Sequence, residues 1–500
     1  MGQEINSHRF VPEDFQCFQQ RLLDNLTRLK CMLNTQQFAE GPVTIGAELE
    51  LYLVDKYLRP LLLNREVIER SGNKQLALEL NRFNLEYNLS PVSALGKPFS
   101  AIESEMLFAI EHVNEQLIAE SGCALPIGIL PTLKRSDFGI KAMTDESRFF
   151  ALTQSLRHLR GRMFRIHIEG EDPLSLRSHD VTLEGANSSM QVHLRVPPAE
   201  FADTFNACQL ITPIIVGLAA NSPFMLGHKL WHETRIPLFS QAIDGRSHED
   251  CKRGVPSRVD FGNGWIREGV YELFAEMVHV HPVILPIDGD ERSSDIDKKS
   301  GVADLTELRV HTGSVWPWNR AVYDPQAGGH FRIEMRAMPA GPTPCDMAAN
   351  AAFAIGLTRG LKENMQELIP AFPFAVLSRN FYEAAEKGIG AQLMWPNIES
   401  GEGLQKRPLL SVAKSLFSTA RKGLVELGVE KEEADYYLDI IEKRILTGTN
   451  GAIWQRKEYQ RLCRGSNASQ ALKRMMQKYM MFSAQNIPVS QWCLSARKGA

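Results

Sequence analysis

Polar and apolar residues alternate strictly in the stretch 46–55, a pattern that predicts a β-strand with two different faces. Glu48 and Glu50 share one face with Gly46 and Tyr52, whereas alanine and leucine fill the other face. Neighbouring carboxylates repel each other, and neither can be buried without a positive partner. For this strand alone, a polar face exposed to solvent is the simplest explanation. Only other segments of the chain can indicate whether its two glutamates belong to a functional site.

Three more segments alternate in the same way, each with an apolar face and a face of ionisable or amide side chains. Their polar faces carry Glu86 in segment 83–89; Gln191, His193 and Arg195 in segment 181–196; and Arg332, Glu334 and Arg336 in segment 331–338. Each group alone has an ordinary structural explanation, such as a salt-bridge ladder or a hydrogen-bonded core histidine. Their joint occurrence favours one shared site.

Segments with helical periodicity separate these strands. Apolar residues recur at spacings of three and four in 12–34, and a capping box of Ser100 and Glu103 begins another helix. Further apolar helices are predicted at 199–221 and 345–366. The simplest assembly is an α+β fold, in which a largely antiparallel sheet has helices on one face and polar side chains on its open face.

The chain changes character after about residue 395. Helical patterns then follow one another at 409–427, 430–446, 452–463 and 468–484, with glycine-rich breaks between them. We therefore expect three regions: an N-terminal helical segment (1–40), a catalytic domain (41–395) and an all-helical C-terminal region (396–500).

Charge and composition exclude several classes of partner. Lys and Arg number 56 against 59 Asp and Glu, with no basic block, which argues against nucleic acid or an anionic membrane as a partner. The 8 cysteines are scattered without a CxxC pair, so no zinc knuckle or disulfide framework is predicted. The longest apolar window, 211–218, is too short to span a bilayer, and the N-terminus has no apolar signal region. We expect a cytoplasmic protein.

The side chains of the four polar faces suit one kind of chemistry. Oxygen-rich sites with a single imidazole favour Mg²⁺ or Mn²⁺ over zinc. Arginines beside a carboxylate-held Mg²⁺ are what the triphosphate of ATP requires. The sequence contains no GxxxxGK[ST], GxGxxG, HExxH or GxSxG motif, so phosphate binding through metals and arginines remains the expectation.

At these same residues the chain resembles the glutamate–cysteine ligases of the second type, a family that includes bacterial carboxylate–amine ligases. The resemblance covers about residues 41–395. It rests on six short motifs in order: Gly46-Ala-Glu-Leu-Glu, Asn84-Leu-Glu-Tyr-Asn-Leu-Ser-Pro91, Glu184-Gly-Ala-Asn-Ser-Ser-Met-Gln-Val-His193, Ala220-Asn-Ser-Pro-Phe224, His232-Glu-Thr-Arg235, and Arg332-Ile-Glu-Met-Arg336 with Ala340-Gly-Pro-Thr343. It implies a curved sheet of the glutamine synthetase type.

The resemblance also implies roles for the matching positions. Its metal ligands match Glu48, Glu50, Glu86, His193 and Glu334. Its catalytic positions, expected to contact phosphate or the substrate carboxylate, match Arg336 and Arg235. On the same polar faces we expect nucleotide binding by Arg332, Arg195 and Gln191. Glu79 is a further, weaker candidate, as an acidic residue shortly before Glu86.

The implied reaction is ATP-dependent amide formation with Mg²⁺ or Mn²⁺. A substrate carboxylate attacks the γ-phosphoryl group of ATP, and the acyl phosphate then reacts with an amine. Glutamate is the expected acid and cysteine one acceptor among several, so the partners are small amino acids and amines. The alternatives are a metal-dependent amide or phosphoester hydrolase and a non-catalytic nucleotide- or amino-acid-binding regulator. We also expect a homo-oligomer, because open polar sheets of this class often close through subunit contacts.

Overall fold

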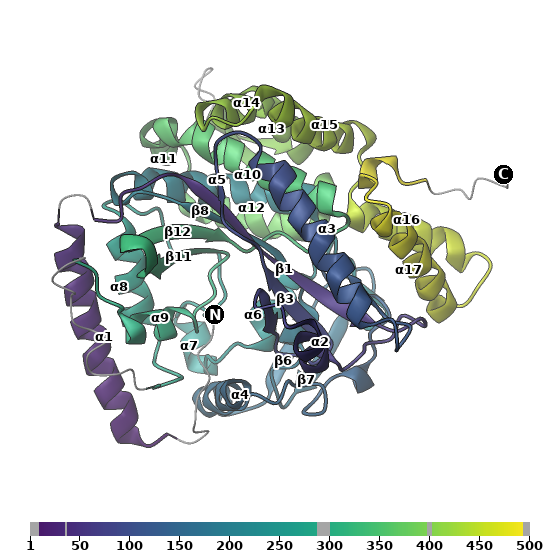
Figure 1. Cartoon of the computed structure of the whole chain (residues 1–500), viewed down its shortest axis with the longest axis horizontal. Helices are drawn as coiled ribbons and strands as arrows, with labels where there is room; N and C mark the ends of the chain where they lie inside the picture. The colour runs from purple at the N-terminus through teal and green to yellow at the C-terminus, as the bar shows by residue number, and fades with distance from the viewer. Residues whose placement is uncertain (1–9, 36–37, 288–300, 398–402, 494–500) are drawn as a thin grey trace.

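A computed structural model describes residues 10–35, 38–287, 301–397 and 403–493. One curled sheet lies at its centre (Figure 1). Its main path has the strand order β11-β12-β8-β1-β3-β2, with β4 and β5 also paired to β1. The strands are β1 (Thr44–Val54), β2 (Leu76–Leu78), β3 (Asn84–Asn88), β4 (Val92–Ser93), β5 (Cys123–Leu125), β8 (Met190–Arg195), β11 (Asn319–Asp324) and β12 (His330–Met335).

Every strand pairing in this sheet is antiparallel, and the α+β fold expected from the sequence is confirmed. In β1 the alternating residues Ala47, Leu49 and Leu51 are buried against the helical layer, as the pattern predicts. Tyr52 departs from it: this residue is buried too, and its ring stacks on Phe83 with the centroids 5.8 Å apart. The polar face of β1 therefore ends at Glu50.

A layer of helices covers the apolar face of the sheet (Figure 1). It comprises α3 (Pro98–Gln116), α5 (Phe201–Ala219), α10 (Pro344–Leu361) and α12 (Phe374–Lys387). The segment Pro198–Ala219, which contains α5, is long and apolar enough to cross a membrane, but 89% of its most apolar window is buried inside the protein. Its apolar surface is thus covered by the other helices and the sheet.

The remaining elements surround the open face and the edges of the sheet. At the edge formed by β11 and β12, the N-terminal helix α1 packs on α8 and α9 (Figure 1), and Asn25 Nδ2 donates to Glu307 Oε2 at 3.2 Å. These elements are α1 (Pro12–Leu33), α2 (Asn64–Ser71), α4 (Ser147–Arg160), β6 (Phe164–Ile168), β7 (Leu174–Ser178), β9 (Phe224–Met225), β10 (His228–Lys229), α6 (Arg235–Ala242), α7 (His248–Lys252), α8 (Val270–Val280), α9 (Thr306–Thr312) and α11 (Met365–Ala371).

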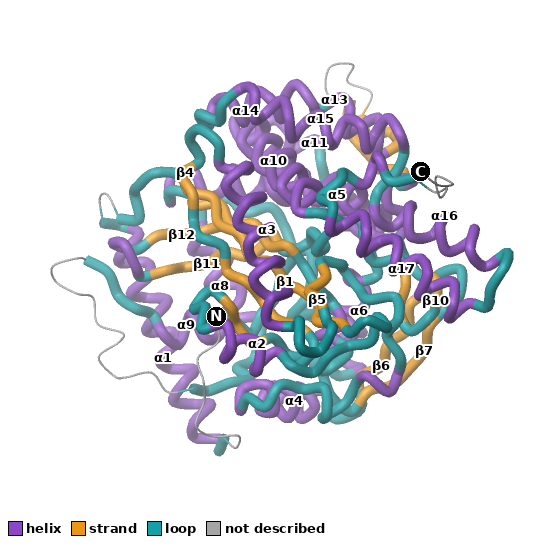
Figure 2. Tube along the Cα trace, turned by 45° about the vertical axis from the view of Figure 1, so that its right-hand side comes forward, coloured by secondary structure: helices purple, strands orange, loops and turns teal. Residues whose placement is uncertain are grey.

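The hairpin of β13 (Gln392–Asn397) and β14 (Gly403–Pro408) crosses the boundary that the sequence suggests near residue 395. Helices follow: α13 (Leu409–Ser415), α14 (Phe417–Glu426), α15 (Lys431–Thr447), α16 (Gly451–Cys463) and α17 (Ala468–Ala484). Figure 2 shows them packed along the helical layer and beside β10. A buried ion pair between Arg444 Nη2 and Asp346 Oδ1 at 2.8 Å joins α15 to α10. The C-terminal helices are therefore part of the same packed body as the sheet.

Candidate active site

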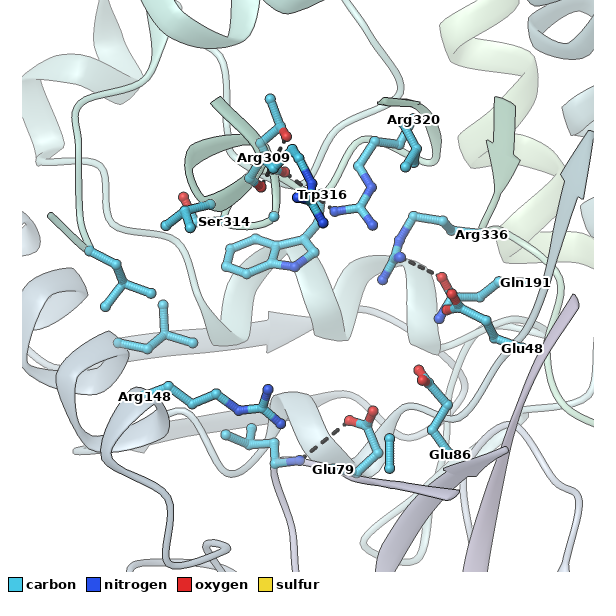
Figure 3. Close-up of a pocket in the computed structure, with 18 of the residues that line it drawn as sticks. Glu48, Glu79, Glu86, Arg148, Gln191, Arg309, Ser314, Trp316, Arg320 and Arg336 are labelled. Atoms are coloured by element: carbon cyan, nitrogen blue, oxygen red, sulfur yellow. Dashed lines mark hydrogen bonds between the residues drawn. The ribbon is translucent and has the colours of Figure 1, made fainter. Parts of the chain in front are cut away.

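The open face of the sheet borders a cavity of about 740 Å³ (Figure 3). Strands β1, β3, β8, β11 and β12 contribute side chains to it, and so do α4, α6 and α9. Six of the candidates from the sequence line it directly: Glu48, Glu50, Glu79, Glu86, Gln191 and Arg332. Arg336, which follows β12, lines it as well.

Five carboxylates gather on one side of this cavity. Glu48 and Glu50 come from β1, and Glu86 of β3 lies directly opposite Glu50 in the strand register. Glu79 precedes β3, and Glu184 lies in the short 3₁₀ helix Glu184–Ala186; both also line the cavity. We call these five side chains the carboxylate cluster. Strand alternation and the pairing of β1 with β3 place most of its members.

The carboxylate cluster carries more negative charge than the neighbouring cations balance. Burial, followed by the charges of Glu48, Glu79 and Glu50, raises the pKa of Glu86 well above its usual range. Burial and the charges of Glu79 and Glu50 do the same to Glu184. Burial and the charge of Glu50 raise the pKa of Glu79 to about 8. A bound cation would relieve this repulsion.

Glu50 is held in a fixed position. Its two carboxylate oxygens accept from Ser189 N and Ser189 Oγ, each at 2.8 Å, and Oε1 also accepts from Gln191 Nε2 at 3.0 Å. Burial nevertheless raises its pKa, although Arg235, Ser189 and Arg336 act in the opposite direction. The other end of the Gln191 amide accepts from Arg336 Nη1. Gln191 thus joins the carboxylate cluster to an arginine.

His193 lies beside the carboxylate cluster without lining the cavity itself, and its Nε2 is paired with Glu48. Nε2 is 3.2 Å from Glu48 Oε1, and His193 faces Glu334 across β8 and β12. Within the described residues the other buried ring nitrogen, Nδ1, has no hydrogen-bond partner. Burial raises the pKa of Glu48, but His193 and Arg336 hold it below its ordinary value. A buried imidazole with one open ring nitrogen beside a carboxylate suits a divalent cation.

Two arginines donate hydrogen bonds to the carboxylate of Glu334. Arg320 of β11, directly opposite in the register, donates to both carboxylate oxygens at 3.1 and 2.8 Å, and Arg336 Nη1 also donates to Glu334. The charges of Arg320, Arg336 and His193 outweigh burial and hold the pKa of Glu334 far below its usual range. Glu334 is 1% exposed and does not line the cavity. In this arrangement it orients two arginines.

Two expected arginines do not reach the cavity. Arg235 is buried in the first turn of α6, where Nη1 donates to Glu233 Oε1 and to the carbonyl oxygen of Ala337, both at 3.2 Å. Arg235 therefore supports the backbone beside Arg336 from behind. Arg195 donates to the carbonyl oxygen of Glu40 at 2.9 Å and lies away from the cavity.

The sequence interpretation missed many residues that line the cavity, among them Arg320, Glu184, Arg148 and Trp316. Arg320 had only a weak signal, because Asn319 and Val322 interrupt the polar–apolar alternation of the stretch 319–324. Glu184 opens one of the quoted motifs, but a 3₁₀ helix has no period-2 face that would single it out. Arg148 and Trp316 lie on a helix and a loop that only the tertiary fold brings to the sheet.

The fit of this site to a divalent cation is partial. The uncompensated carboxylate cluster and the open Nδ1 of His193 are suitable donors. However, no group of three or more His, Cys, Asp or Glu side chains is spaced to hold a metal ion in the described part of the chain. The arginines on Glu334 are part of the reason why no such group forms, since they bind carboxylate oxygens that would otherwise face a cation.

The sequence matches the profile of glutamate–cysteine ligase family 2 over residues 44–476. The chain belongs to this family. Membership assigns it to the carboxylate–amine ligases. The match extends well beyond residue 395, so the family region includes most of the C-terminal helices as well as the sheet. A search of curated protein sequences finds no match.

Solved structures with a related arrangement are distant in sequence. The glutamate–cysteine ligase of Francisella tularensis in complex with AMP is 11% identical, with a TM-score of 0.44 over 92% of this chain and 91% of that one. A bifunctional glutathione synthetase from Pasteurella multocida is also 11% identical, with a TM-score of 0.43 over 93% of this chain and 55% of that one. The complex of the prokaryotic ubiquitin-like protein Pup with its ligase PafA gives 11% identity and a TM-score of 0.38, over 93% and 76%. These likenesses are too low to carry over a substrate.

Proposed function

We propose that this family member is an ATP-dependent carboxylate–amine ligase that forms an amide of the γ-glutamyl type through an acyl phosphate. The observation that carries the proposal is the pairing, in one cavity, of an uncompensated carboxylate cluster with Arg320, Arg332 and Arg336. Carboxylates of this kind suit divalent cations, and arginines suit phosphate oxygens. Mg²⁺ or Mn²⁺, when bound, would neutralise phosphate charge and draw nucleotide and acid together.

The residues of the site have different roles in this proposal. Glu48, Glu50, Glu86 and His193 are the proposed cation ligands. Glu79 and Glu184 extend this acidic surface. In this proposal Glu334 acts through Arg320 and Arg336, because it orients both guanidinium groups.

Catalysis in this proposal rests on positioning and charge. Arg336 lies between Gln191 and Glu334, where its guanidinium would stabilise the charge that develops on a transferring phosphoryl group. The carboxylate of the acid would attack the γ-phosphoryl group, releasing ADP, and the amine would then displace phosphate from the acyl phosphate. Gln191 holds Arg336 and Glu50 at a fixed separation, so acid and phosphate would meet in a preformed geometry.

Phosphate release from ATP, measured with Mg²⁺ or Mn²⁺ and a matrix of amino acids and amines, tests the proposal. We expect release that depends on both an acid and an amine, with glutamate as the first acid to try. Glu86→Gln should lower this rate by about 10²–10³-fold, because it removes charge from the proposed cation site. Glu363→Gln, which changes a glutamate at the surface, is the matched control.

Two other functions give different results in the same assay. A metal-dependent hydrolase would turn over amides or phosphoesters without nucleotide, and such turnover would refute the ligase proposal. A non-catalytic regulator would bind nucleotide without releasing phosphate under any combination of substrates. A cytoplasmic location and a homo-oligomeric state remain predictions from the sequence.

A further inference from the structure

One wall of the active-site cavity is apolar, in contrast to the carboxylate cluster. Six side chains form it: Phe149, Leu152, Phe239, Ile243, Leu285 and Trp316. They come from α4, from α6 and the residue that ends it, and from two loop segments. We call these six residues the apolar wall. Figure 3 shows Trp316 between Ser314 on one side and Arg320 and Arg336 on the other.

The strand register places Trp316 at the same end of β11 and β12 as Arg320 and Arg336, whereas Arg332 lies towards the other end. Strand β11 runs from Asn319, opposite Met335, to Asp324, opposite His330. Trp316 precedes β11 and therefore lies beyond the end at which Asn319 pairs with Met335. Arg332, ion-paired with Asp324 at 2.8 Å, marks the second end. Arg336 N donates to the carbonyl oxygen of Trp318 at 2.9 Å, so the apolar wall begins beside the arginine that is proposed to act on the transferring phosphoryl group.

The apolar wall is held rigid from behind. The ring of Trp316 packs on Phe239, with the centroids 6.2 Å apart, and Phe239 meets the buried Trp318 edge-on at 5.8 Å. Ile243 is 2% exposed although it lines the cavity. On the opposite side, the guanidinium carbon of Arg148 lies 4.6 Å from the centre of the Phe149 ring. Binding of an apolar group to a preformed apolar surface of this kind is favourable, because the group displaces water from it.

We propose that the amine substrate carries a bulky apolar or aromatic group, which fills the space against the apolar wall. The inference rests on the ligase function proposed above and specifies its second substrate. In that function the acid and the transferring phosphoryl group meet at Arg336, and the amine must approach the acyl phosphate from the space beside it. The apolar wall is then left for the body of the amine.

This inference disfavours cysteine and other small amines as the physiological acceptor. A thiol-bearing side chain of two heavy atoms would cover little of a wall built from three aromatic and three aliphatic residues. Hydrophobic pockets discriminate by about 10-fold or more for each methylene that fills or leaves them. We therefore expect kcat/KM for leucine or phenethylamine to exceed that for cysteine or glycine by at least about 10-fold.

The first experiment compares these four amines in the phosphate-release assay, with the full chain, ATP, Mg²⁺ and glutamate. A preference of at least 10-fold for the two apolar amines supports the inference, and an equal or higher kcat/KM for cysteine overturns it. Titration calorimetry of the same amines, in the presence of ADP and Mg²⁺, measures binding without turnover. Tighter binding of the apolar amines supports the inference even if no acid gives turnover, a result that would contradict only the ligase proposal. Binding no tighter than that of glycine overturns the inference.

The second experiment replaces the centre of the apolar wall. Trp316→Ala should raise KM for the preferred apolar amine by at least about 10-fold and change KM for ATP by less than 2-fold, and Trp316→Phe should restore most of the loss. A rise in KM for ATP without one for the amine would mean that the wall holds the adenine ring, and would overturn the inference. Trp265→Ala is the matched control, because Trp265 packs on Phe374 at 5.4 Å and does not line the cavity.

Discussion

The pH dependence of stability should reveal one buried carboxyl outside the active site, that of Asp260. Oδ1 of this residue accepts from Gly262 N at 2.9 Å, and its carbonyl oxygen accepts from Trp318 N at 2.9 Å. Burial, reinforced by the charge of Glu276, raises the pKa of Asp260 from 3.8 to about 7, against the opposing effects of Gly262 N–H and Arg246. A carboxyl in this position is protonated in the folded protein over much of the acidic range.

The sign of the effect follows from the raised pKa. The contribution of Asp260 to the free energy of unfolding is fully present below pH 3.8 and is lost as the pH rises through about 7. Each pH unit in this interval costs about 1.4 kcal/mol, so the loss between pH 5 and pH 8 is at most about 2.6 kcal/mol. Asp260 is partly exposed and lines a small cavity, and water there would screen its charge. We expect a loss of about 1–2.5 kcal/mol.

Asp260→Asn removes the titration and keeps an acceptor for Gly262 N. For 500 residues the entropy of unfolding is about 1 kcal/mol per degree, so 1 kcal/mol corresponds to about 1 °C in Tm. Between pH 5 and pH 8, the Tm of the variant should therefore rise relative to wild type by about 1–2.5 °C. Differential scanning calorimetry at both pH values measures the difference.

The control is Asp250→Asn in the capping box of α7, where hydrogen bonds from Ser247 lower the pKa of Asp250 below 3.8. That group is ionised in both states above pH 5, so its variant should differ from wild type by the same Tm at both pH values. If the Asp260 variant also keeps a constant difference, or if it loses stability relative to wild type towards pH 8, the reasoning about a buried protonated carboxyl is wrong.

Three further predictions concern the site and its support. Tyr479→Phe removes the hydroxyl that accepts from Asn221 Nδ2 at 2.8 Å, so calorimetry should find the free energy of unfolding lower by about 1–3 kcal/mol; an unchanged Tm would contradict the role of this bond. Mg²⁺ without nucleotide, at about 100 times its Kd, should stabilise wild type by about 2.7 kcal/mol and Glu86→Gln clearly less; equal shifts in a thermal melt would exclude Glu86 as a ligand. Arg320→Met leaves Glu334 with Arg336 alone, and kcat/KM for ATP in the phosphate-release assay should fall at least about 10-fold, whereas an unchanged value would assign Arg320 a purely structural role.

The sheet could be predicted because its strands carry a local signal. Period-2 alternation assigns Glu48 and Glu50 to one face without any knowledge of the fold. The same pattern identifies the polar faces that contain Glu86, His193 and Glu334, and the antiparallel register then brings them together. In the structure Glu48 contacts His193, and Glu334 lies opposite His193 in the strand register.

The rest of the site depends on contacts between distant segments, for which the sequence carries no local signal. Arg235 matched a family motif, but its neighbour Glu233 and the carbonyl oxygen of Ala337 hold it behind the cavity wall. A motif gives the residue type at a position and not the direction of its side chain. The burial of Tyr52 could not be predicted for a similar reason. Its position follows the alternation of β1, but the ring of Phe83 packs against it and buries it.

The C-terminal helices are connected to the site by one buried network. Tyr479 of α17 accepts from Asn221 Nδ2, and Asn221 N donates to Glu233 Oε2 at 2.9 Å. Glu233 pairs with Arg235 at 3.2 Å, and Arg235 Nη2 donates to the carbonyl oxygen of Arg336 at 3.4 Å. Glu233 is fully buried, and loss of its partners would leave a charge without compensation. The helices that follow the sheet in sequence therefore support the backbone that presents Arg336.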